Sequence, residues 1–132
     1  MMAKKIFISY DYDNDKHYKN MLKAWDANGA FDFSFDDHSA DVSINSTDAA
    51  AIKRAISAKI NNATYFLCIV GDKTHKSSWV KWEIEKAVEL SKKIVAVKTS
   101  STNTTPSELL GVGAKWAMSF AETSITSAIN DA

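Results

Sequence analysis

The segment Tyr65–Ala87, YFLCIVGDKTHKSSWVKWEIEKA, contains the pattern that decides the fold. Its opening residues, Tyr65–Val70, are apolar throughout, which predicts a central strand covered on both faces. A polar loop runs from Gly71 to Ser78. The helix that follows carries Val80, Ile84, Ala87 and Val88 at the i, i+4, i+7 and i+8 spacing of a stripe docked on a sheet. A buried strand followed by an amphipathic helix is typical of an α/β protein.

This helix is expected to bring a glutamate and a tryptophan together at the edge of its stripe. At about 100° per residue, Glu83 lies roughly 60° from Val80, whereas Glu85 and Glu89 face water. Trp79 precedes Glu83 by one turn, so the two side chains should be neighbours. A carboxylate beside an aromatic ring, half out of solvent, can stabilise positive charge on a flat ligand. The pattern also fits a surface helix with solvated acids and one tryptophan that shields the core.

Further segments have the composition of strands. Lys5–Tyr10 is β-branched and aromatic, and Ile94–Val97 is apolar throughout, so both are expected to be buried. Phe31–Asp36 alternates strictly between apolar and polar residues, which predicts a strand with one wet face at the edge of the sheet. Lys115–Phe120 is the expected fifth strand.

Helices are expected between these strands, and one long polar loop. The first helix starts after Asp11–Asp15 and stops at Gly29, and its apolar stripe consists of Tyr18, Met21, Leu22 and Trp25. The second runs from Thr47 to Ile60, and a closing helix runs from Ala121 to Ile129. The loop Asp37–Ser46 is polar and mostly small, and loops of this length in compact domains are often functional.

Strand and helix thus alternate along the chain. This alternation predicts a single three-layer α/β domain over residues 1–132, with a five-stranded parallel sheet and helices on both faces. With Phe31–Asp36 at an edge, the flavodoxin-like strand order 2-1-3-4-5 is the simplest arrangement. The switch point then lies between strands one and three, where open α/β sheets bind ligands. Ser9–Asp15 and Gly71–Trp79 would reach that crevice, and Glu83 would face it.

Composition argues against several classes of partner. The 132 residues include 16 basic and 16 acidic side chains, and a neutral chain without a basic cluster argues against nucleic-acid binding. No apolar run reaches the roughly 18 residues that span a bilayer, and Met1–Lys5 lacks the apolar region of a signal peptide. We therefore expect a cytoplasmic protein without a membrane partner.

The cysteine and the histidines give little sign of chemistry. Cys68 lies inside an apolar run, which favours a small buried hydrophobe over a nucleophile. His17, His38 and His75 are scattered without the spacing of metal ligands, so no metal is expected.

A phosphoacceptor receiver domain is one alternative for this arrangement. It would use Asp11 and Asp13 after the first strand and Asp72 after the third. The lysine expected at the end of the fifth strand is missing, because Ser119 and Phe120 stand there. No P-loop and no dinucleotide-binding glycine fingerprint is present, so a dinucleotide would not be bound in the Rossmann manner.

The chain resembles Toll/interleukin-1-receptor-like (TIR) domains in three segments: Ile6–Asp11, the Trp-x-x-x-Glu helix Trp79–Ile84, and Lys93–Val97. Within these it is most similar to the TIR-like proteins of bacterial Thoeris anti-phage systems. The resemblance implies an enzyme that cleaves NAD at the nicotinamide–ribose bond. It also implies an ADP-ribose-type second messenger, which reaches a partner effector by diffusion, and the family's catalytic glutamate falls on Glu83. Other TIR domains are non-enzymatic scaffolds, and fold alone does not decide between the two.

Cleavage of NAD is compatible with a single carboxylate. The nicotinamide of NAD is already a cationic leaving group, so no strong general acid is required. The reaction needs stabilisation of an oxocarbenium-like ribose, which one carboxylate can supply. The residues alone leave the product open among free ADP-ribose, a cyclic isomer and a conjugate to another acceptor.

Four further residues are candidates for binding NAD. Trp79 or Tyr10 could stack on a base, and the loop Asp37–Ser46 could close over the ligand. Ser9 and Asp36 end strands one and two and could bind ribose or groups near the phosphates. Because an acid facing phosphates is unfavourable, Asp36 suits ribose better.

Trp82 is the candidate for contacts with other proteins. It lies roughly 180° from the middle of the buried stripe, so in a monomer we expect it to be exposed. An outward tryptophan is the type of residue that anchors an interface. The TIR resemblance implies self-association, which gives such an anchor a reason.

Overall fold

The computed structural model describes residues 4–27, 33–37 and 47–132. In chain order, its strands (β), α-helices (α) and short 3-10 helices (η) are β1 (Lys4–Ser9), α1 (Tyr12–Ala27), β2 (Phe33–Asp37), α2 (Ala49–Asn62), β3 (Tyr65–Val70), η1 (Thr74–Lys76), α3 (Ser78–Glu89), β4 (Lys93–Lys98), η2 (Ser107–Leu109), β5 (Lys115–Ala117) and α4 (Glu122–Asp131).

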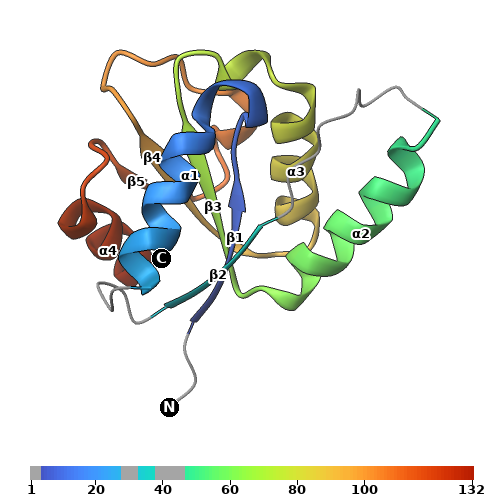
Figure 1. Ribbon diagram of the computed structural model, residues 1–132, viewed down its shortest axis with the longest axis horizontal. Helices are drawn as coiled ribbons and strands as arrows, with labels where there is room; N and C mark the ends of the chain where they lie inside the picture. The colour runs from blue at the N-terminus through green and yellow to red at the C-terminus, as the bar shows by residue number, and fades with distance from the viewer. Residues whose placement is uncertain (1–3, 28–32, 38–46) are drawn as a thin grey trace.

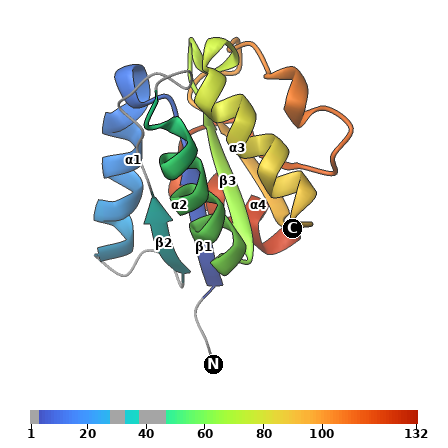
Figure 2. The same cartoon turned by 90° about the vertical axis from the view of Figure 1, so that its right-hand side faces the viewer.

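The strands form one sheet in the order β2-β1-β3-β4-β5, and every neighbouring pair is parallel. Helices α1 and α4 cover one face, and α2 and α3 cover the other (Figure 1). In Figure 2, α2 and α3 lie side by side over the sheet. The α/β class and the parallel sheet with helices on both faces are thus confirmed. The observed order is the flavodoxin-like one that the sequence favours, with β2 at an edge.

The fifth strand is shorter than the sequence predicts. It covers Lys115–Ala117 rather than Lys115–Phe120, and Met118 is already 53% exposed. In the described sheet β5 is an edge strand that pairs only with β4, so backbone hydrogen bonds stabilise it on one side only. The predicted edge strand 31–36 is described only from residue 33. Residues 31 and 32, the helix stop at Gly29 and most of the loop Asp37–Ser46 lie outside the described residues.

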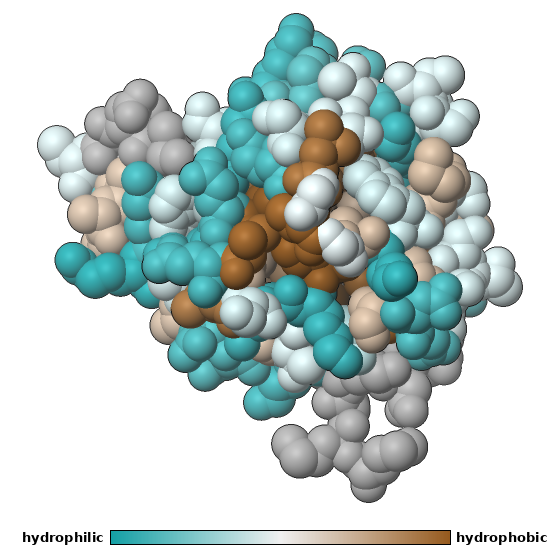
Figure 3. Space-filling model, turned by 180° about the vertical axis from the view of Figure 1, so that it is seen from behind, coloured by the Kyte–Doolittle hydropathy of each residue, from teal (hydrophilic) through white to brown (hydrophobic). Residues whose placement is uncertain are grey.

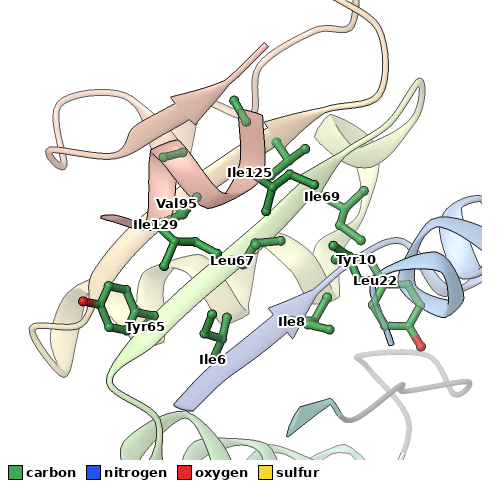
Figure 4. Close-up of a cluster of buried hydrophobic side chains, with 13 residues drawn as sticks. Ile6, Ile8, Tyr10, Leu22, Tyr65, Leu67, Ile69, Val95, Ile125 and Ile129 are labelled. Atoms are coloured by element: carbon green, nitrogen blue, oxygen red, sulfur yellow. The ribbon is translucent and has the colours of Figure 1, made fainter. Parts of the chain in front are cut away.

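Two apolar clusters fill the layers on either side of the sheet. Alternate residues of a strand point to opposite faces, so β1 contributes to both. Ile6 and Ile8 pack with α1 and α4 in the cluster shown in Figure 4, whereas Phe7 packs with α2 and α3. The ring of Phe7 stacks on that of Phe66, with centroids 5.8 Å apart. Strand β3 is buried at every position, which confirms the predicted central strand.

The apolar stripe of α3 docks on this second face. Val80, Ile84 and Ala87 are fully buried, as the spacing predicts. Val88, expected in the same stripe, is 42% exposed, because it lies at the margin of the stripe, away from its centre. Figure 3, seen from behind, shows an apolar area at the centre of that side of the molecule. None of the described helices combines the length and the hydropathy that a membrane span requires.

Candidate active site

The carboxyl group of Glu83 is held inside the protein by the way α3 begins and packs. Ser77 caps the helix, since its Oγ accepts a hydrogen bond from the Val80 backbone N at 3.2 Å. The buried stripe then fixes the rotation of the helix, and Glu83 lies on the rim that faces β1. Its exposure is only 4%. The sequence predicts a carboxylate half out of solvent. That expectation is wrong, because α3 contacts both β1 and the neighbouring helix α2.

Ser9, the last residue of β1, meets this carboxyl group. Its Oγ donates a hydrogen bond to Glu83 Oε1 at 2.7 Å, and Ser9 is itself 1% exposed. In the sheet Ser9 lies beside Cys68 of β3. The pair therefore lies over the carboxyl end of β1 and against β3, at the switch point of the strand order.

Burial controls the protonation of this site. It raises the pKa of Glu83 to about 8, and the hydrogen bond from Ser9 opposes the shift without cancelling it. A carboxyl group with this pKa holds its proton at neutral pH while the site is empty. Burial, and then the charges of Glu83 and Asp15, also raise the pKa of the Cys68 thiol far above its usual range. Cys68 is a free, fully buried thiol that stays protonated, as its place in an apolar run suggests.

The two tryptophans of α3 pack against each other. The Trp79 and Trp82 rings are 6.0 Å apart and nearly perpendicular, and both pack against the α2–α3 core cluster. Trp82 is half-buried rather than exposed, which corrects the sequence prediction. Helix α2 lies beside it and brings Lys53 Nζ to 5.6 Å from its ring, and Lys86 of its own helix lies at 5.9 Å. Angles on one helix cannot reveal such a neighbour.

Tyr10 and Asp36 lie next to Ser9 along the chain and on the neighbouring strand, respectively. Tyr10 follows Ser9, so its side chain enters the opposite layer, where it is 6% exposed and packs with Ile8 and Leu22 (Figure 4). Lys19 Nζ lies 5.7 Å from its ring. The backbone of Asp36 pairs with Phe7 in the β1–β2 ladder, on the edge strand next to Ser9's strand.

Sequence reasoning missed a second buried polar group near the same end of the sheet. Asp15, in the first turn of α1, is 4% exposed, and Thr74 of η1 is fully buried. Thr74 Oγ1 donates to Asp15 Oδ2 at 3.1 Å. One signal was available: Asp15 precedes Tyr18 and Leu22 at i, i+3 and i+7, which puts it on the buried stripe of α1.

Of the acids that suggested a receiver domain, Asp11 has a structural role. Asp11 Oδ1 accepts from the backbone N of Asp13 at 3.2 Å, and its Oδ2 accepts from Asn14 Nδ2 at 2.6 Å, so it caps α1. Asp72 is exposed. Across the described ranges, no group of three or more His, Cys, Asp and Glu side chains could hold a metal ion.

The sequence profile of the family described as Thoeris protein ThsB, TIR-like domain, matches residues 7–104. The chain belongs to this family. It is 29% identical over 104 residues to ThsB1 of Bacillus cereus (strain MSX-D12), which bears the name of a candidate cyclic ADP-D-ribose synthase. That match covers 73% of the chain and 52% of the relative, so the chain spans about half the length of the curated relative it matches.

Solved structures share the fold of this TIR-like domain. A 2-deoxyribosyltransferase from Bacillus psychrosaccharolyticus has a TM-score of 0.64 at 13% identity, covering 91% of this chain and 90% of that one. The CMP N-glycosidase BcmB of Clostridium botulinum has a TM-score of 0.61 at 12% identity, with coverage of 96% and 99%. The TIR domains of the Roq1 resistosome have a TM-score of 0.53 at 11% identity, with coverage of 98% and 86%. At these identities the likeness shows the fold alone.

Proposed function

We propose that residues 1–132 form a TIR-type enzyme domain that cleaves NAD at the nicotinamide–ribose bond. The product would be an ADP-ribose-derived messenger for anti-phage defence, in keeping with the family and with the cyclic product in the relative's name. The observation that carries the proposal is the Ser9–Glu83 pair, a buried carboxyl group held at 2.7 Å by a hydroxyl at the switch point of the sheet. In this proposal Glu83 is the catalytic residue and Ser9 orients it.

The raised pKa of Glu83 suits a cationic substrate. For Glu83 to be largely ionised at neutral pH, its pKa must fall from about 8 to about 6, which takes roughly 2.7 kcal/mol. A positive charge about 4 Å away supplies roughly 4 kcal/mol at an effective dielectric constant of about 20. The pyridinium charge of bound NAD would therefore ionise Glu83. The carboxylate would then stabilise the oxocarbenium-like ribose as the neutral nicotinamide leaves.

The other candidates take supporting roles in this proposal. Trp79, one turn before Glu83, would form an aromatic wall beside the reacting ribose. Asp36, on the strand next to Ser9's strand, would bind a ribose hydroxyl. Tyr10 would support β1 from the opposite layer. NAD is the substrate and no metal is required; self-association and an effector reached through the diffusible product complete the proposal.

A non-enzymatic TIR interaction module is the second candidate. It is favoured by large apolar side chains that reach the surface, above all Leu110 at 64% exposure and Met118 at 53%. Such side chains are the kind that bind another protein.

Incubation of the purified protein with NAD, followed by mass spectrometry, separates the two candidates. We expect nicotinamide and an ADP-ribose-derived product from the wild type and no product from Glu83→Gln. Glu85→Gln is the matched control, since Glu85 lies on the same helix but is exposed, and it should keep the wild-type rate. Intact NAD in all three samples, with every protein folded, would favour the interaction module.

A further inference from the structure

A buried polar network joins the start of α1 to the segment between β3 and α3. Thr74 Oγ1 is its centre. It lies 3.1 Å from Asp15 Oδ2 and 3.2 Å from the carbonyl oxygen of Ile69, and it accepts a hydrogen bond from the Gly71 backbone N at 2.8 Å. All of these contacts are buried. They gather at the carboxyl ends of β1 and β3, the upper end of the sheet in Figure 1.

Gly71 is part of this network because its lack of a side chain leaves room for the Asp15 carboxyl group. A Cβ atom placed on Gly71 would overlap the carboxyl group of Asp15. The carboxyl group therefore packs directly on the backbone that follows β3, and any larger residue at position 71 would displace it. The turn after β3 is held against α1 by close packing as well as by hydrogen bonds.

The network is connected to Glu83 through a short, rigid path. The backbone N of Ser77 donates to the carbonyl oxygen of Thr74 at 3.0 Å, which closes η1. Ser77 then caps α3 through its side chain. Helix α3 carries Glu83 in its second turn. A shift of Thr74 would therefore move the start of the helix that bears the carboxyl group.

Two side-chain hydrogen bonds thus join the β1–α1 segment to the η1–α3 segment. They are Ser9–Glu83, whose partners are 74 residues apart in sequence, and Asp15–Thr74, whose partners are 59 apart. We propose that the Asp15–Thr74–Gly71 network is a positioning device, which holds the start of α3 so that the carboxyl group of Glu83 stays within hydrogen-bonding distance of Ser9. The inference rests on the proposed function only for its kinetic readout.

The carboxyl group of Asp15 depends on its hydrogen bond from Thr74. Burial raises the pKa of Asp15, the hydrogen bond from Thr74 lowers it, and Asp11, His17 and Asp72 make smaller contributions. A buried carboxyl group is costly without a partner, and so is a buried backbone N–H. Loss of the Thr74 hydroxyl would remove the hydrogen bonds that it makes with Asp15 and Gly71 at once, so the turn would have to move.

The test compares Thr74→Val, which keeps the shape and removes the hydroxyl, with Thr74→Ser, which restores it. Thr123→Val, on the exposed surface of α4, is the control. For Thr74→Val we expect kcat for NAD to fall about tenfold or more while KM changes little, because misplaced catalytic groups lose rate rather than binding. Hydrogen exchange over residues 71–81 should accelerate. Thr74→Ser should restore both.

A second variant and a second readout keep the test decisive. Gly71→Ala leaves Thr74 in place and displaces the Asp15 carboxyl group, so it should reproduce the kinetic loss even if Thr74→Val does not fold. Carboxyl carbon NMR should show the pKa of Glu83 rising further above its ordinary value in both variants, because the hydrogen bond from Ser9 that lowers it is weakened. If the wild type does not turn over NAD, the proposed function fails, and exchange and NMR still decide the inference. Folded variants that keep the wild-type titration of Glu83 and wild-type exchange over 71–81 would overturn it.

Discussion

The carboxyl group of Glu83 illustrates how a single residue can lower the stability of a fold. Its pKa in the folded protein, about 8, lies above the ordinary value of 4.5. As the pH rises, the unfolded chain therefore releases this proton first, and ionisation favours unfolding. The contribution of Glu83 to stability is fully present below about pH 4.5 and is lost as the pH approaches about 8.

Glu83→Gln should for this reason stabilise the protein, and more so at higher pH. Glutamine keeps an acceptor for the Ser9 hydroxyl and cannot ionise. We expect its free energy of unfolding to exceed that of the wild type by a few kcal/mol, at most about 5, near pH 8, and to match it near pH 4.5. Urea unfolding at both pH values measures the difference, with Glu85→Gln beside it. A gain that is the same at both pH values would contradict the stated cause.

For a single residue, the sequence predicts the face of the helix on which the side chain lies better than the extent of its burial. Helical spacing correctly brings Glu83 to the rim of the stripe, but its burial depends on β1 and α2, which no local pattern reveals. The alternation along β1 could have separated Ser9 from Tyr10, since neighbouring strand residues point to opposite faces. The structure does separate them into different layers.

Helix α3 is the element on which the candidate site depends, and Ser77 controls where it begins. Ser77→Ala removes the side-chain acceptor for the Val80 backbone N and should lower the free energy of unfolding by about 1 kcal/mol. Ser78→Ala, one residue later and exposed, should have little effect. Urea unfolding of the two variants in the same buffer is the measurement. Equal stability for both would mean that the cap contributes nothing to this helix.

Elements with continuous apolar runs were the easiest to predict. Strand β3 and the stripe of α3 follow directly from hydrophobic period, whereas β5 ends early because only β4 pairs with it in the described sheet. The network around Thr74 lies beyond such reasoning. Asp15 and Thr74 are 59 residues apart in sequence. Their contact depends on the turn at Gly71 and on the start of α1, which no local pattern places together.

The whole molecule consists of one sheet with two separately packed layers. Trp82 belongs to the layer of α2 and α3, where it is half-buried and edge-on to Trp79. Trp82→Ala should therefore act within one protomer and lower the free energy of unfolding by about 2 kcal/mol, roughly half of the loss for a fully buried tryptophan.

Self-association is a separate property that dilution can test. Light scattering and specific activity over a hundredfold dilution, for the wild type and Trp82→Ala, report on it directly. We expect the two proteins to associate alike, because Trp82 packs against the α2–α3 core cluster of its own protomer. A variant that keeps its stability and loses association would return Trp82 to the role of an interface anchor.

The lone cysteine of the chain lies beside Ser9, beneath the candidate site, and no solvent reaches it. A thiol reagent can modify it only when this part of the protein opens, so the rate of thiol labelling reports local opening at the site. The labelling rate, divided by the rate for the unfolded chain, gives the fraction of time that the site is open. A ligand that binds over Glu83 would slow the labelling of Cys68, so ligand binding could be measured on the protein without a dye or a tag.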